Sequence, residues 1–203
     1  MFTGLIREMA TVKNYSGNTL TLKASHRPKL GDSIAINGTC LSVTALLADG
    51  FSVELSPETQ AFIATENLKN RIHIEPAMMM GDRFEGHIVQ GHIDAIGTVD
   101  QIKNNGNSFD VIIKIDPKHI GNIIPKGSIT IDGVSLTVNE VFKDSFRLTI
   151  IPITMKETLF GSYKKGSRVN IETDMFARYV AHIIAHQKAS LSWDEIDHIH
   201  SLY

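Results

Sequence analysis

Five side chains in this sequence are candidate acids, bases or nucleophiles, each in or beside a segment that predicts a strand or a helix: Cys40, His92, Ser135, Thr137 and Asp174. An imidazole exchanges protons near neutral pH, and a hydroxyl or thiol becomes a nucleophile when a base takes its proton. A carboxylate can orient either group. The five residue types therefore predict acid–base or nucleophilic chemistry.

Each of these residues also has a purely structural interpretation. Cys40 stands in an apolar strand pattern, where cysteine is often a small buried hydrophobe. His92 alone is compatible with a structural histidine, and Ser135 and Thr137 alternate with apolar residues as in any half-buried strand. Asp174 precedes a helical pattern and can be its N-cap. Residue type leaves both interpretations open at all five positions.

Metal chemistry is not expected. Cys40 is the only cysteine, which excludes an internal disulfide and a cysteine-rich metal knuckle. His182 and His186 have the four-residue spacing of a metal pair, but no third ligand accompanies them. We interpret the two histidines as part of the polar face of a helix.

Composition limits the class of protein. The 203 residues are 42% hydrophobic and 21% charged, and 20 basic against 22 acidic side chains give a net charge of −2. No basic stripe indicates nucleic-acid binding. No apolar run approaches the ~20 residues that cross a bilayer, and the first residues lack the features of a secretory signal. We expect a cytoplasmic enzyme or binding protein without nucleic-acid or membrane partners.

The chain is duplicated. Residues 33–43 (SIAINGTCLSV) match residues 128–138 (SITIDGVSLTV) at an offset of 95. Residues 71–75 match 168–172 after a small insertion, and residues 4–6 match 91–93. Because repeats of this kind mark repeated structural units, we predict two similar domains.

Each half reads as β structure. Asn37-Gly38 and Asp132-Gly133 separate short apolar strands, which is a strong hairpin signal. Six short strands close together favour a small barrel, because closure removes exposed edges. Short helical turns are expected after Pro57 and Pro152. The predicted strands are residues 6–14, 18–24, 33–36, 40–46, 50–55 and 71–75, then 93–103, 109–115, 128–131, 134–142, 146–151 and 168–172.

The pattern changes after Glu172. Apolar residues recur at helical spacing from Met175 to Ile184, which predicts an amphipathic helix. Such a helix needs an apolar partner, either a barrel or copies of itself in an oligomer, and periodicity does not choose between them. Ser192 to Glu195 resembles a helix-capping box, to which we assign no function.

The two halves differ at positions that carry chemistry. The repeat aligns Leu5 with His92, Cys40 with Ser135, Ser42 with Thr137 and Ala77 with Asp174. The second half therefore gains an imidazole and a carboxylate. From this asymmetry we expect the second barrel to do more of the acid–base work.

With the duplication established, the sequence resembles riboflavin synthases. The resemblance is carried by MFTG at residues 1–4, NGTCLSV at 37–43, GHIVQGHID at 86–94, KGS at 126–128, IDGVSLTV at 131–138 and IPIT at 151–154. It departs from the family at three positions. Thr39-Cys40 replaces two adjacent cysteines, Ser42 replaces a commoner threonine, and Ile153 fills a polar position.

The resemblance implies a mainly β fold: two tandem six-stranded Greek-key barrels and a C-terminal helix that mediates a homotrimer. The substrate would be 6,7-dimethyl-8-ribityllumazine. One molecule donates a four-carbon unit to another, which gives riboflavin and 5-amino-6-ribitylamino-pyrimidinedione. Each reacting pair would lie between the N-terminal barrel of one subunit and the C-terminal barrel of another. The resemblance implies no metal or redox cofactor. It does imply a possible association with lumazine synthase.

Substrate contacts are predicted by the same resemblance at the barrel mouths, where loop backbone groups can serve an amide-rich ring. The implied domains are residues 1–85, 86–173 and 174–203. The predicted contacts are Gly4, Leu5, Ile6, Cys40, Leu41, Ser42, Glu54, Leu55, Ser56, Pro57, Glu58, Thr59, Gly91, His92, Ile93, Lys126, Ser135, Leu136, Thr137, Ile151, Pro152, Ile153, Thr154, Met155 and Lys156.

Two other functions fit the same pattern. A non-catalytic lumazine- or flavin-binding protein would share the duplication and could lose polar groups from the second barrel. A scaffold protein would explain the fold but not the concentrated motifs. The presence of His92, Ser135, Thr137 and Asp174 favours the enzyme.

Overall fold

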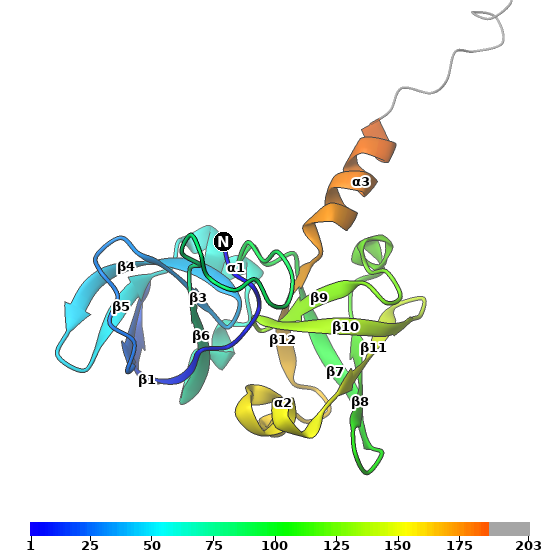
Figure 1. The fold of residues 1–203 in the computed structure, drawn as a ribbon, viewed down its shortest axis with the longest axis horizontal. Coiled ribbons are helices and arrows are strands. Elements are labelled where there is room, and N and C mark those ends of the chain that lie inside the picture. Colours follow the sequence, from blue (N-terminus) through cyan, green and yellow to red (C-terminus); the bar gives the residue numbers. More distant parts are fainter. Residues whose placement is uncertain (187–203) are drawn as a thin grey trace, which may run out of the picture.

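A computed structural model describes residues 1–186 of the chain, and these residues form two closed antiparallel barrels and a C-terminal helix (Figure 1). The first barrel has the strand order β1-β2-β5-β4-β3-β6, and the second has the equivalent order β7-β8-β11-β10-β9-β12. This order is a Greek key, so the predicted fold class is confirmed. The capping-box motif at residues 192–195 lies outside the described residues.

The strands lie within two residues of the predicted segments at nearly every end. Those of the first barrel are β1 (Glu8–Ser16), β2 (Thr19–Lys23), β3 (Ser33–Ile36), β4 (Thr39–Leu47), β5 (Gly50–Glu54) and β6 (Arg71–Pro76). Those of the second are β7 (Ala95–Asn104), β8 (Phe109–Lys114), β9 (Ser128–Ile131), β10 (Val134–Val141), β11 (Ser145–Ile150) and β12 (Arg168–Thr173).

Short helices connect the fifth and sixth strands of each barrel. They are α1 (Pro57–Phe62) with the 3-10 turn η1 (Thr65–Asn67), and α2 (Pro152–Glu157) with η3 (Leu159–Ser162). Each α-helix begins at a proline, whose fixed φ suits the first helical position and whose missing N–H is not needed there. The predicted turns after Pro57 and Pro152 are confirmed. A further 3-10 turn, η2 (Pro117–Asn122), precedes β9.

Alternating apolar residues fill each barrel. Leu20, Phe51 and Ile72 are fully buried in the first, as are Val111, Phe146 and Val169 in the second. The register slips by one residue in β1, β4, β7 and β10, at equivalent places in the two halves. Bulges of this kind increase strand bending, which helps a small sheet to close.

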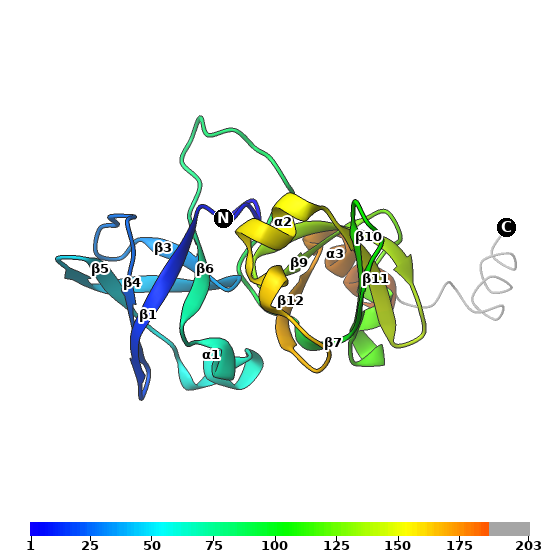
Figure 2. The ribbon, with the colours of Figure 1, turned by 90° about the horizontal axis from the view of Figure 1, so that it is seen from below.

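The two barrels lie side by side (Figure 2) and contact each other through equivalent residues, as in a local twofold arrangement. Phe2 forms a β-bridge with Val89, its repeat equivalent. A Cβ atom on Gly38 would lie 2.7 Å from the Gly133 nitrogen, and one on Gly133 would lie 2.9 Å from the Gly38 nitrogen. The two hairpin turns are therefore packed backbone against backbone at the centre of the molecule.

Helix α3 (Met175–His186) confirms the helix predicted from the apolar stripe, and it projects away from both barrels (Figure 1). Phe176, Val180, Ile183 and Ile184 on it are 55–66% exposed. Over the described part of the chain, no helix is long and apolar enough to cross a membrane.

Candidate active site

A cavity of about 240 Å³ opens at the mouth of the first barrel. It brings together several predicted residues from the start of β4, from α1 and from the segment that precedes β7. Its walls are formed by Thr39, Cys40, Glu58, Thr59, Phe62, Ile63, Gly91, His92 and Ile93. The first barrel thus needs residues 91–93 from the second half to complete its pocket.

Cys40 and Gly91 are locked together in that pocket. The Cys40 backbone N–H donates to the Gly91 carbonyl oxygen at 2.9 Å. Gly91 has φ +80°, and a Cβ atom there would lie 2.6 Å from the Cys40 Cβ, so only glycine fits without a shift. Ile93 packs against the first hydrophobic core.

The equivalent arrangement occurs at the second barrel. The Ser135 backbone N–H donates to the Gly4 carbonyl oxygen at 2.8 Å, and a Cβ atom on Gly4 would lie 2.6 Å from the Ser135 Cβ. Ile6 packs against the second hydrophobic core. The segment that leads into each barrel therefore covers the other barrel.

Because of this crossing, the His92 side chain lies at the first barrel and not at the second, where it was expected. Comparison of the halves placed His92 among the acid–base groups of the second barrel, whereas its side chain lines the first-barrel pocket. The reason is that residues 91–93 cross to the first barrel before β7 begins.

Two buried glutamates hold the crossing segments. Glu75 accepts hydrogen bonds from the N–H groups of Thr3 (2.7 Å) and Gly4 (3.0 Å). Glu172 accepts from the N–H groups of Gln90 and Gly91, both at 2.8 Å. Burial raises the pKa of Glu75, and it raises the pKa of Glu172 to about 7 against the opposing effect of these hydrogen bonds. Sequence reasoning missed both residues, although their matching place in the repeat was a signal.

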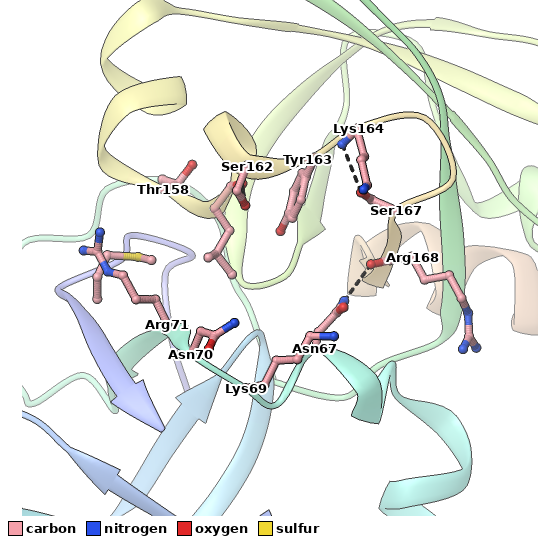
Figure 3. A pocket seen from close by; sticks show the side chains of 12 residues that line it. Asn67, Lys69, Asn70, Arg71, Thr158, Ser162, Tyr163, Lys164, Ser167 and Arg168 are labelled. Atoms are coloured by element: carbon pink, nitrogen blue, oxygen red, sulfur yellow. Dashed lines mark hydrogen bonds between the residues drawn. The ribbon is translucent and has the colours of Figure 1, made fainter. Parts of the chain in front are cut away.

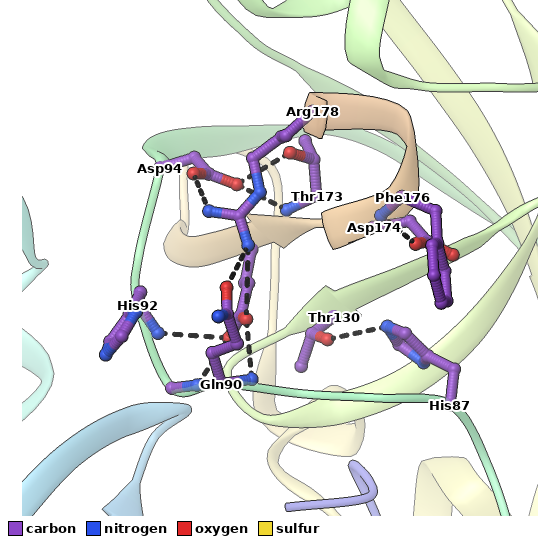
Figure 4. A network of polar contacts seen from close by, with 11 residues as sticks. His87, Gln90, His92, Asp94, Thr130, Thr173, Asp174, Phe176 and Arg178 are labelled. Atoms are coloured by element: carbon purple, nitrogen blue, oxygen red, sulfur yellow. Dashed lines mark hydrogen bonds and ion pairs between the residues drawn. The ribbon is translucent and has the colours of Figure 1, made fainter. Parts of the chain in front are cut away.

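The second barrel contains an imidazole that sequence reasoning also missed. His87 Nδ1 lies 2.7 Å from the Ser135 Oγ. His87 Nε2 lies 3.3 Å from the Thr130 Oγ1 (Figure 4). Burial lowers the pKa of His87, and the charge of Asp174 opposes that shift. The available signal was the sequence Gly-His-Ile, which occurs at both 86–88 and 91–93.

The His87 arrangement suits proton transfer. A neutral imidazole that donates from Nε2 to Thr130 leaves Nδ1 free to accept the proton of the Ser135 hydroxyl. Because burial favours the neutral ring, His87 is available as a base near neutral pH. The pair can therefore draw a proton through Ser135 from a bound molecule.

Asp174 lies at the start of α3 and near His87. Its Oδ1 accepts the N–H of Phe176 at 2.9 Å, so it caps α3. It also lies close enough to His87 for its charge to act on that ring.

Other predicted residues are distributed around the barrel mouths. The side chains of Ser42, Glu54, Lys126 and Thr137 are exposed, as are those of Ser56, Pro57, Ile151, Pro152, Ile153 and Lys156. Leu41 and Leu55 are buried in the first core, and Leu136 and Met155 pack against the second. Side chains in those cores can shape a pocket, but polar contacts at these positions would come from the backbone.

A different cavity, of about 530 Å³, contains none of the predicted residues (Figure 3). It lies between the barrels, next to η3 and the turn before β6. Its polar walls include Asn67, Lys69, Arg71, Tyr163, Lys164 and Arg168. The predicted site is therefore separate from this inter-barrel cavity.

No cluster of three or more potential metal ligands occurs within residues 1–186. His182 and His186 stack on each other along α3, with ring centroids 4.0 Å apart. This contact agrees with their interpretation as a helix surface.

A known domain family matches both halves of the chain. The lumazine binding domain family matches residues 3–77 and again residues 90–174. A riboflavin synthase from Actinobacillus pleuropneumoniae is 41% identical over 198 residues, covering 93% of this chain and 92% of the relative. One from Photobacterium phosphoreum is 39% identical over 195 residues, covering 91% and 89%. One from Bacillus subtilis is 38% identical over 189 residues, covering 89% and 88%.

A solved structure shares the fold at lower identity. The crystal structure of LumP complexed with riboflavin matches with a TM-score of 0.76 and 24% identity, covering 86% of this chain and all of that one. The chain, with its two lumazine-binding barrels and its similarity to these relatives over almost their full length, belongs to the riboflavin synthase family.

Proposed function

We propose that this protein is a riboflavin synthase, a transferase that converts two molecules of 6,7-dimethyl-8-ribityllumazine into riboflavin and 5-amino-6-ribitylamino-pyrimidinedione. Family membership supports the activity. The observation that favours an enzyme over a non-catalytic binding protein is the Ser135–His87 pair, because binding alone does not need a base on a partly buried hydroxyl.

In the proposed mechanism, the two barrels have different tasks. The C7 methyl group of one lumazine is acidic because the ring is electron-poor. Its proton moves to the Ser135 oxygen as the Ser135 hydroxyl proton moves to His87, which leaves an anion delocalised over the lumazine and an imidazolium at His87. Asp174 stabilises the imidazolium that forms, since its charge favours the protonated ring. The first-barrel pocket, with Cys40 and His92 in its walls, holds the other lumazine in near-attack geometry.

Assembly is part of this proposal. The exposed apolar side chains of α3 support self-association of the chain through this helix. We propose that the assembly is the homotrimer that the family resemblance implies, with the first barrel of one chain facing the second barrel of another. We expect Val180→Asp with Ile184→Asp to lower the mass measured by light scattering. His182→Asp on the same helix is the matched control and should leave the mass unchanged. An unchanged mass in the double variant would exclude α3 from assembly.

Location and division of the chain are also proposals. We expect a cytoplasmic protein. We also expect it to associate with lumazine synthase, which co-purification would test. We keep domains at residues 1–85, 86–173 and 174–203, with residues 4–6 and 91–93 each contributing to the opposite barrel.

Flavin formation tests the activity directly. Purified protein incubated with ribityl-lumazine should produce riboflavin without added metal, nicotinamide or nucleotide, and a chelator should leave the rate unchanged. Tight lumazine binding without flavin formation would instead support a non-catalytic lumazine-binding protein.

A further inference from the structure

Arg178 lies in the first half of α3, but its side chain turns back toward the second barrel (Figure 4). Its Nη1 donates to the Asp94 Oδ1 at 2.8 Å, and its Nη2 donates to the Gln90 Oε1 at 2.8 Å. The same Nη2 lies 3.7 Å from the Glu172 Oε1. The side chain is 23% exposed, so the guanidinium is largely shielded from water.

These partners fix the segment that completes the first-barrel pocket. Glu172 binds the backbone N–H groups of residues 90 and 91, and that of His92 at 3.2 Å. Asp94 accepts from both the N–H and the Oγ1 of Thr173, each at 2.6 Å. Arg178 joins both carboxylates and the Gln90 side chain, so it connects α3 to residues 90–94.

The first half lacks this device at the equivalent place. There Glu75 alone holds the segment, through Thr3 and Gly4. The residue that corresponds to Asp94 is Arg7, since the N–H groups of both donate to equivalent carbonyl groups of the sixth strand. The second half therefore has one more carboxylate in this region, and a cation is needed to offset the repulsion between the two.

Electrostatics agree with this role. Burial raises the pKa of Glu172, Asp94 raises it further, and Arg178 opposes both. Without the cation, Glu172 would more readily take up a proton, and its carboxyl would then be a weaker acceptor for the backbone of residues 90–92.

We propose that Arg178 is a positioning residue: from α3 it holds residues 90–92 in place as a wall of the first-barrel pocket, and so links the assembly helix to ligand binding in that pocket. The proposal rests on the proposed function, because it treats this pocket as a lumazine site. Arg178 does not itself line the cavity that contains Cys40 and His92.

Cys40 provides a reporter that needs no ligand. It is the only cysteine, it lines the pocket, and its backbone is bonded to Gly91. In the full-length protein we expect Arg178→Ala to increase the rate of Cys40 alkylation by iodoacetamide about tenfold, because loss of charge-assisted hydrogen bonds frees the covering segment. Arg178→Lys, which keeps the charge, should restore much of the slow rate.

Arg147 is the matched control. It is also 23% exposed and also pairs with two carboxylates, those of Asp110 and Glu140, but it lies on β11 outside both pockets. Arg147→Ala should leave the alkylation rate unchanged. An equal increase in Arg147→Ala would show a general loss of stability and overturn the proposal, as would an unchanged rate in Arg178→Ala.

Assembly is tested separately with Ile184→Asp, which alters the exposed apolar side of α3 without touching the network. We expect Arg178→Ala to expose Cys40 while light scattering still gives the wild-type mass. Arg178→Ala could instead lower the mass, and Ile184→Asp could raise the alkylation rate of Cys40 as much as Arg178→Ala does. Together these two results would show that Arg178 acts through assembly alone and would overturn the proposal.

The ligand experiment completes the test. With ribityl-lumazine, Arg178→Ala should raise KM more than it lowers kcat, since the Ser135–His87 pair is intact. If only kcat falls, Arg178 does not position the binding pocket. If wild-type protein forms no flavin, the proposed function fails, while the alkylation rates still decide whether Arg178 holds residues 90–92.

Discussion

The two barrels have the same backbone plan but different polar side chains. Ser135 and Thr130 in the second barrel correspond to Cys40 and Ala35 in the first, and Asp174 corresponds to Ala77. His87 lies ahead of the segments in which the two halves match. Duplication therefore supplies two barrel mouths with one backbone plan, and His87 adds a base beside Ser135 at the second. Similar pockets with different chemistry suit a reaction between two identical molecules.

The junction between the barrels shows that different groups can do the same structural work. His73 Nδ1 donates to the Asp132 carbonyl oxygen at 2.7 Å, and the Asn170 Nδ2 donates to the Asn37 carbonyl oxygen at 2.9 Å. His73 Nε2 and Asn170 Oδ1 each accept a backbone N–H at 2.8 Å, from η3 and from the turn before η1. The two halves therefore keep the same hydrogen-bond pattern, although His73 can be protonated and Asn170 cannot.

Removing the base should give the largest difference between the barrels. We expect His87→Ala and Ser135→Ala each to lower kcat by about 10²–10⁴-fold, the usual range for general acid–base catalysis. The double variant should be no slower than the slower single one, because the two groups act as a unit. Cys40→Ala should lower kcat by less than about tenfold. Steady-state flavin formation measures all four, and equal losses in Cys40→Ala and Ser135→Ala would remove the asymmetry.

Much of this fold could be predicted from sequence. The repeat and the strand pattern predicted both barrels, and helical spacing predicted α3, because strand and helix periodicities are local. The crossing of residues 4–6 and 91–93 is not local, so His92 was expected at the wrong barrel. His87 was missed for a related reason: comparison of aligned halves cannot identify a residue that lies outside the aligned segments.

The junction should give the next largest effect, on stability. Burial raises the pKa of Asp132 to about 7, so between pH 4 and 7 the folded state keeps a proton that the unfolded state loses. Stability from this group therefore falls as pH rises through that window. Asp132→Asn introduces the residue that the first barrel has at the equivalent position, Asn37. It should remove this pH-dependent loss of unfolding free energy, which is up to about 4 kcal/mol.

Urea unfolding at several pH values measures this difference. The opposite contribution of His73, whose pKa burial lowers to about 4, is common to both proteins and cancels in the comparison. Parallel stability curves for wild type and Asp132→Asn would contradict an ionisable Asp132 at the junction.

The glycine pair should give a smaller, symmetrical effect. Gly4 and Gly91 both have positive φ, and a Cβ on either would lie 2.6 Å from the Cβ of Ser135 or Cys40, respectively. Alanine at each position should cost about 1–3 kcal/mol of unfolding free energy. Gly91→Ala should speed Cys40 alkylation, whereas Gly4→Ala should leave it unchanged and disturb the Ser135 side. Equal alkylation rates in the two variants would contradict the crossing of the segments.

The central claim is that proton abstraction belongs to the second barrel, and exchange at the C7 methyl group tests it most directly. In D₂O, NMR follows loss of the methyl signal of ribityl-lumazine, with a protein-free sample as the baseline. Wild type and Cys40→Ala should exchange at rates within about threefold of each other, and His87→Ala and Ser135→Ala should be slower by about 100-fold. Exchange at the wild-type rate in His87→Ala, or an equal loss in Cys40→Ala, would contradict this account.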